Sequence, residues 1–155
     1  MVSTRCSALV CAALSILFVS ACGGGPAART PSGPPLGAPD VPWAHKSHED
    51  RQAFMAAHVE PTMRHLFQKW KPSAYSGFEC ATCHGKDMDV IDFKMPNALY
   101  SLPAENTIAE AKDYDADTTD FMMKEVVPTF AKLLSEKASE PGQPGVNCFS
   151  CHPKE

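Results

Sequence analysis

Two stretches of this chain, 67 residues apart, share one pattern of apolar and small residues. Phe54, Met55, Val59, Pro61, Thr62 and Leu66 recur as Phe121, Met122, Val126, Pro128, Thr129 and Leu133. Within each stretch, leaving out the proline, the positions from the methionine to the leucine are four, three and four residues apart. This spacing places them on one face of a helix. The pattern therefore predicts two related amphipathic helices, and the proline inside each should kink it or mark its true start.

After each predicted helix come a polar loop, a glycine and the same five-residue motif. Gly77 recurs as Gly145 at an offset of 68, and the motif C-x-x-C-H follows each glycine, at residues 80–84 and 148–152. This order of elements predicts a small all-α domain of two tandem helix–turn–CxxCH repeats with long loops. The repeats span about residues 51–85 and 118–153.

The pattern changes at the amino end. A short positive start and the apolar run at residues 6–19 resemble a signal peptide, and the run is too short to span a bilayer. The sequence Val-Ser-Ala-Cys that ends at Cys22 resembles a bacterial lipoprotein cleavage site. We therefore expect removal of residues 1–21 and lipidation of Cys22, with an ordinary cleavage site as the alternative. Residues 22–42 are rich in Gly and Pro, which predicts a disordered tether, and residues 43–155 form the folded domain.

Composition adds two constraints. The formal net charge is −4, which does not favour nucleic acid as a partner. Of the seven cysteines, Cys6 and Cys11 lie in the predicted signal peptide and Cys22 takes the lipid. Four cysteines then remain, as the two pairs of the repeated motif, so we expect no disulfide.

The motif C-x-x-C-H is the attachment site of c-type haem. Its two thiols form thioethers to the porphyrin, and its histidine binds the iron. We therefore expect two covalently bound c-type haems, which should supply much of the apolar surface that a domain of this size needs. The attachment residues are Cys80, Cys83, Cys148 and Cys151, and the axial histidines are His84 and His152.

The repeated helix face predicts the second axial ligand of each iron. The face begins with Met55 in one unit and with Met122 in the other, and a thioether ligand raises the haem potential relative to two nitrogens. We expect Met55 to bind the first haem iron and Met122 the second. Core packing is the alternative role for both. Other candidate ligands are Met123, Met63, His45, His48, His58 and His65. Met63 matches Phe130 in the second stretch, which favours a packing role for it.

A methionine-bearing helix followed by Gly-Val-x-Cys-x-x-Cys-His resembles the repeat of the photosynthetic reaction-centre cytochrome c subunit. Residues 145–152 are the closest stretch, and residues 77–84 are a looser copy. The resemblance implies an all-α, lipid-anchored electron carrier that faces the periplasm and whose haems have His/Met ligation. The chain has two motifs where that family usually has four, so we do not extend the resemblance to a reaction centre as the partner.

These features predict a dihaem c-type cytochrome that transfers electrons between a redox donor and an acceptor, and not an enzyme. The alternative is a small dihaem peroxidase or oxidase with one open iron, in which His58 or His65 would supply the polar group. Zinc binding by the cysteine pairs is a third interpretation. We expect an exported protein held by its lipid at a membrane and facing the periplasm, and Gly23 after Cys22 favours the outer membrane.

Two further segments carry candidate roles. Asp113, Asp115, Asp117 and Asp120 precede the second predicted ligand helix, where acids cap free backbone amides. An acidic docking patch for a basic redox partner is the alternative. The apolar loop at residues 93–97 is expected to pack as a lid on the edge of the first haem.

Overall fold

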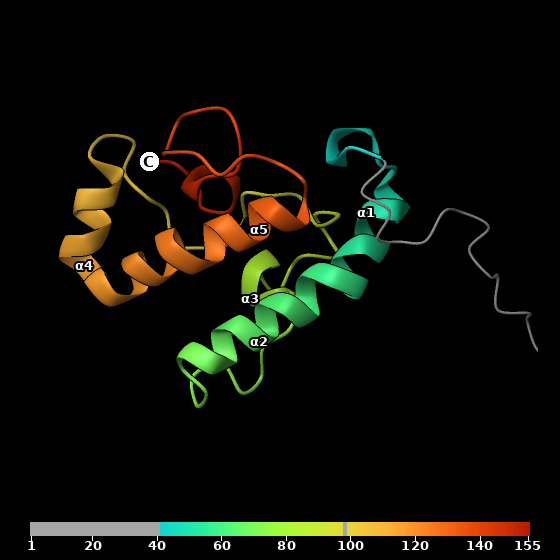
Figure 1. Ribbon diagram of the computed structural model, residues 1–155, viewed down its shortest axis with the longest axis horizontal. Helices are drawn as coiled ribbons and strands as arrows, with labels where there is room; N and C mark the ends of the chain where they lie inside the picture. Colours follow the sequence, from blue (N-terminus) through green and yellow to red (C-terminus); the bar gives the residue numbers. More distant parts are fainter. Residues whose placement is uncertain (1–40, 98) are drawn as a thin grey trace, which may run out of the picture. The chain divides into compact units, whose positions relative to one another are not determined.

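The computed structural model describes residues 41–97 and 99–155, and its regular secondary structure is helical (Figure 1). Within those residues, extended segments meet in two isolated bridges, Leu102 with Lys154 and Ala138 with Val146, and no strand is formed. The predicted all-α class is confirmed at this level. The predicted signal peptide, the lipidation site Cys22 and residues 22–40 of the predicted tether lie outside the described residues.

The first predicted helix is one continuous run that starts at a serine cap. The Ser47 hydroxyl accepts a hydrogen bond from the backbone N–H of Asp50 at 3.1 Å, which satisfies a free amide of the first turn. Arg51 donates to the backbone carbonyl of Trp43 and so holds the preceding turn against the helix. The elements are the 3-10 turn η1 (Trp43–His45), α1 (His48–Phe54), the π-helical segment η2 (Met55–Val59) and α2 (Glu60–Trp70).

The second predicted helix begins earlier than the sequence suggested and contains a kink. Its elements are α4 (Thr107–Phe121), the π-helical segment η3 (Met122–Val126) and α5 (Val127–Leu133). Asp115 has φ −154° and ψ 93°, which breaks α4 into two pieces. The Asp115 carboxylate accepts from the Thr118 backbone N–H at 2.9 Å and from the Thr118 hydroxyl at 2.7 Å. One of the four predicted capping aspartates therefore does cap a helix, at this internal start.

Both long helices contain a π-helical turn at the same place in the 67-residue pattern. The backbone N–H of Glu60 donates to the carbonyl of Met55, and that of Val127 donates to the carbonyl of Met122, five residues back in each case. A proline follows each of these donors directly. Because proline has no N–H and its ring clashes with the carbonyl of the preceding turn, a wider turn there lets the helix continue. The prolines therefore neither start nor end the helices.

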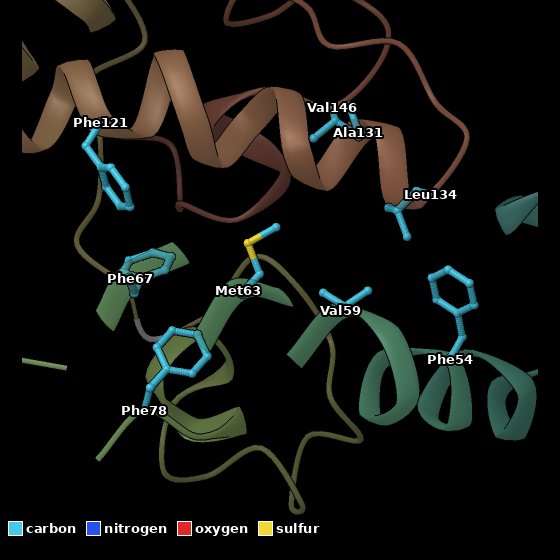
Figure 2. Close-up of a cluster of buried hydrophobic side chains, with 9 residues drawn as sticks. All are labelled: Phe54, Val59, Met63, Phe67, Phe78, Phe121, Ala131, Leu134 and Val146. Atoms are coloured by element: carbon cyan, nitrogen blue, oxygen red, sulfur yellow. The ribbon is translucent and has the colours of Figure 1, made fainter. Parts of the chain in front are cut away.

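The two long helices run side by side in opposite directions (Figure 1), with α2 packed on η3 and α5 packed on η2. Large side chains from both fill the space between them (Figure 2). Trp70 at the end of α2 stacks on Phe121, with ring centroids 4.0 Å apart and planes at 8°. Phe67 meets the same ring edge-on at 5.1 Å. The buried cluster comprises Phe54, Val59, Met63, Phe67, Phe78, Phe121, Ala131, Leu134 and Val146.

Two short elements carry the repeated motifs: α3 (Cys80–His84) and the 3-10 turn η4 (Cys148–Ser150). The residues after η4 pair with the segment that leads into α4. The Leu102 N–H donates to the carbonyl of Pro153 at 2.9 Å, and the Glu155 N–H donates to the carbonyl of Leu102 at 3.0 Å. These hydrogen bonds hold the second motif against the segment that connects the two repeats. None of the helices in the described part of the chain is both long and apolar enough to cross a bilayer.

Candidate functional site

Both C-x-x-C-H motifs are built on a turn that a hydroxyl inside the motif closes. The backbone N–H of Glu79 donates to the Thr82 hydroxyl at 3.0 Å, and the backbone N–H of Asn147 donates to the Ser150 hydroxyl at 3.1 Å. Thr82 and Ser150 each stand directly before the second cysteine of their motif. The sequence contains a signal for this turn that is independent of the haem motif itself: a hydroxyl residue stands at the same motif position in both repeats.

The second turn is held by more hydrogen bonds than the first. The Asn147 side chain is buried, accepts from the Phe149 N–H at 2.9 Å and donates to the carbonyl of Gln143 at 2.9 Å. Gly145, just before it, has φ +118°, and a Cβ there would lie 2.3 Å from the carbonyl oxygen of Lys137. No atom lies within 4 Å of a Cβ built on Gly77. The two repeated glycines therefore differ, since only Gly145 is sterically required to be glycine.

All four motif cysteines are free thiols. Burial raises the pKa of Cys83 to about 12, and the thiols of Cys151 and Cys80 add to the increase. Burial likewise raises the pKa of Cys151 to about 11, with a contribution from Cys148. A thiol that stays protonated at neutral pH is a poor nucleophile, which disfavours a dithiol redox site.

His152 is oriented by the main chain of a distant residue. Its ring nitrogen Nδ1 lies 2.8 Å from the backbone carbonyl oxygen of Tyr100. In the tautomer that donates from Nδ1, this bond fixes the ring plane and leaves Nε2 with its lone pair free. Histidines that bind metals usually have their other ring nitrogen held in this way. Tyr100 lies 52 residues before His152, so no local sequence signal could have identified this partner.

His84 lies in a more apolar environment. Burial lowers the pKa of His84, an effect that the backbone of Phe93 partly offsets. Nδ1 of the ring is buried and has no hydrogen-bond partner among the described residues. The Phe93 ring lies edge-on to it at 5.6 Å, and the Asn97 side chain donates to the His84 carbonyl at 2.7 Å. The loop at residues 93–97 therefore packs against the first motif, where the lid was expected.

The predicted distal methionines lie at matched positions. Met55 and Met122 are half-buried, each is the first residue of a π-helical segment, and each packs against the buried cluster. Met123 is also half-buried, and its sulfur lies 3.9 Å from the sulfur of Cys148. Met63 is buried in the core between the helices (Figure 2), so its predicted role in packing agrees with its position.

Of the four histidines outside the motifs, three are exposed. His45 and His65 lie at the surface, and the exposed His48 lies 3.1 Å from the carboxylate of Asp92. His58 is half-buried, with its ring centroid 5.0 Å from that of Phe54. Within the described residues, no three His, Cys, Asp or Glu side chains converge as a metal-ion site.

Two open surface depressions lie at matched places along the helix pair. Phe54 and His58 line the larger one, of about 420 Å³, together with Thr62, Thr129, Lys132, Leu133 and Ser135. The smaller one, of about 250 Å³, is lined by the corresponding Phe121 and Glu125, together with Trp70, Asp117, Asp120 and Lys124. The lining of the two depressions therefore differs in charge: the first contains His58 and Lys132, whereas the second contains three acidic residues, with Glu125 in the place of His58.

Three observations agree with covalent attachment of haem at these residues. The cysteines are unpaired thiols, the histidine of the second motif has one ring nitrogen fixed by a carbonyl, and the histidine of the first has a buried nitrogen without a partner. No protein-family model matches this chain, and no curated protein or solved structure matches it either.

Proposed function

We propose that this chain is a dihaem c-type cytochrome that carries electrons between two redox partners. The observation that supports it best is the 2.8 Å contact between His152 Nδ1 and the carbonyl oxygen of Tyr100, next to the free, half-buried thiol of Cys151. A histidine with one nitrogen held and the other free, directly after two unpaired cysteines, is the donor set that c-type attachment uses.

The four thiols would hold the two haems. Cys80 and Cys83 would attach the first and Cys148 and Cys151 the second, and His84 and His152 would bind the irons. When bound, each haem supplies a one-electron couple, which is the redox chemistry of the protein. The capped turns hold the two cysteines of each pair and the following histidine in a fixed spatial arrangement, as attachment requires.

The chain's own residues also set the environment of that couple. The Tyr100 carbonyl orients His152 and raises the basicity of its imidazole, since a hydrogen bond from Nδ1 increases electron density on the ring. The Phe93 ring packs edge-on against His84 and shields part of the imidazole from water.

The distal ligands follow from the repeated helix face and its π-helical turns. Met55 is proposed for the first haem. For the second, the repeat favours Met122, whereas the sulfur contact with Cys148 favours Met123. Residues one apart on a helix differ by about 100° in direction, so only one of the two faces the iron. Lipidation at Cys22 and a position facing the periplasm belong to the same proposal, by the resemblance of the amino end to a lipoprotein signal.

Mass spectrometry of the protein tests this proposal directly. The full chain is produced in a bacterium that has haem-attachment machinery, and intact mass and the pyridine haemochrome spectrum are measured. We expect the mass of two haems and a spectrum of two thioether bonds per haem. The double variants Cys80→Ala/Cys83→Ala and Cys148→Ala/Cys151→Ala should each lose one haem. Bare cysteines at both pairs in the native chain contradict the proposal.

A haem enzyme is the second candidate, because the half-buried His58 lines the larger of the two open depressions. A distal histidine beside a cavity is what O–O bond cleavage at an open iron requires. Carbon monoxide added to the reduced protein distinguishes the two functions. An immediate spectral shift shows an open iron and favours the enzyme, whereas an unchanged spectrum agrees with the carrier.

A further inference from the structure

Two tyrosine rings stack on each other at the surface. Tyr100 is 61% exposed and Tyr114 is 77% exposed, and their ring centroids lie 5.2 Å apart with planes at 18°. An exposed aromatic pair removes little apolar surface from water, so its contribution to folding is small. Contiguous exposed aromatic surface with a polar border is typical of a protein-binding site.

This pair is connected to the second motif through a single residue. The Tyr100 carbonyl is the hydrogen-bond partner of His152 Nδ1, and Leu102, two residues on, pairs with the chain on both sides of Lys154. The exposed Tyr100 ring therefore belongs to the same residue that orients the proposed iron ligand. No other exposed aromatic ring in the described part of the chain has such a bond to His152.

The exposed residues next to the tyrosine pair, here called its border, are acidic. Glu110 lies one helical turn before Tyr114, which places it on the same face of α4, and it is exposed. Asp113 is adjacent to Tyr114 and exposed, and the exposed Glu155 donates its backbone N–H to the carbonyl of Leu102, two residues after Tyr100.

The lysines near this border make contacts of their own. Lys112 lies 2.8 Å from the carboxylate of Asp120, and the ammonium of Lys154 lies 5.6 Å from the centroid of the Phe149 ring. They therefore offset the carboxylates of the border less than free lysines would. A cationic side chain from another protein can lie over a tyrosine face and be attracted by these carboxylates at once.

We propose that the Tyr100–Tyr114 pair is the docking surface for a redox partner protein whose own docking face carries lysine and arginine. The proposal rests on the proposed function, since it concerns the protein that would exchange electrons with the second haem. Tyrosine side chains contribute rigid contact area, and the acidic border steers a basic partner during encounter. Electrons then pass between the partner and the second haem at this face.

Stopped-flow kinetics with a soluble, lysine-rich monohaem cytochrome c as the probe tests the proposal. The variants Tyr100→Ala, Tyr114→Ala and Glu110→Lys of the haem-loaded protein are compared with the native chain. Tyr100→Ala keeps the backbone carbonyl that holds His152. We expect each variant to lower the second-order rate constant at low salt by about tenfold, the effect of losing one strong interface contact. Glu110→Lys should also flatten the decrease of the rate with ionic strength.

The control is Val90→Ala, which removes an equally exposed apolar side chain, 87% exposed, from the loop after the first motif. It should leave the rate unchanged. Reduction by dithionite, a small molecule that needs no docking surface, should proceed at the native rate in Tyr114→Ala, Glu110→Lys and Val90→Ala, whose residues lie outside the contact with His152. Equal rates for all variants with the cytochrome probe overturn the docking surface, while haem content and dithionite reduction still report on the proposed function. Absence of haem from the native chain overturns the proposed function instead.

Discussion

The thioether sulfur of Met123 lies 3.9 Å from the thiol sulfur of Cys148. This contact joins the π-helical turn of the second long helix to the first cysteine of the second motif. The preceding residue, Met122, packs against the buried cluster between the helices. Of the two adjacent methionines, Met123 is therefore the one that faces the proposed attachment site.

Substitution of the two methionines separates their roles. We expect Met123→Leu to remove the near-infrared His/Met band of one haem from the low-temperature magnetic circular dichroism spectrum, because leucine has no sulfur to bind iron. Met122→Leu should keep that band and lower the free energy of unfolding by less than about 1.5 kcal/mol, as is usual for a volume-conserving change. Loss of the band in Met122→Leu, with the band kept in Met123→Leu, contradicts the assignment and supports the ligand predicted from the repeat.

Gly145 provides a test of the turn before the second motif. A Cβ there would lie 2.3 Å from the Lys137 carbonyl oxygen, which also accepts the Val146 N–H at 2.8 Å. We expect Gly145→Ala to lower the free energy of unfolding by about 1–3 kcal/mol, from the strained positive φ and the displaced carbonyl. Urea unfolding monitored by far-ultraviolet circular dichroism measures the change.

The matched control is Gly77→Ala, at the equivalent position of the first repeat. No atom lies within 4 Å of the added Cβ, and the residue has no positive φ. Stability should be unchanged or slightly higher, since alanine reduces the freedom of the unfolded chain. A large loss of stability at Gly77 would contradict the view that the two glycines differ.

The hydroxyls inside the motifs give a third prediction. Thr82→Val and Ser150→Ala each remove the acceptor of a backbone N–H, that of Glu79 in one case and of Asn147 in the other. We expect each to lower the free energy of unfolding by about 1 kcal/mol, the usual cost of losing a cap, and to lower the yield of haem-loaded protein. Urea titration and the haemochrome spectrum measure the two effects. Ser76→Ala, which removes an exposed hydroxyl outside the motif turns, serves as the control and should change neither.

The sequence predicted the elements that depend on local periodicity and repetition. The step of four, three and four residues identified two helices, and the match of Met63 with Phe130 indicated packing, which agrees with the burial of Met63. The repeat also placed the two prolines at one structural position. It left open whether they kink or start a helix, because that depends on whether the preceding turn can widen. The structure shows a π-helical turn before each of them.

Other features of the site depend on contacts between residues far apart in the chain. The carbonyl that holds His152 belongs to Tyr100, and no periodic pattern relates these two positions. The start of α4 at Thr107 was missed because the aspartate run resembles the beginning of a helix. The structure places Asp115 at an internal break, where it does cap the following turn. The difference between Gly77 and Gly145 was likewise invisible, since it arises from the approach of Lys137.

Asp120 makes the stability of the second helix depend on pH at the acid end. Hydrogen bonds from Lys112 and then from Lys124 lower the pKa of Asp120 to about 2, from an ordinary value of 3.8. Its carboxylate lies 2.8 Å from the first lysine and 2.7 Å from the second. A folded-state pKa below the unfolded one stabilises the fold above pH 3.8, and this stabilisation is lost as the pH falls through about 2.

Asp120→Asn should therefore be less stable than the native chain near neutral pH, and the difference should disappear between about pH 4 and pH 2. The effect should be small and should shrink in high salt, because the pair is exposed to solvent and screened. Urea midpoints measured between pH 2 and pH 7 give the curve. Asp113→Asn, an exposed carboxylate on the same helix, is the control and should show no comparable convergence. A stability difference for Asp120→Asn that persists at pH 2 would show that the asparagine acts on packing and not on the ion pair with Lys112 and Lys124.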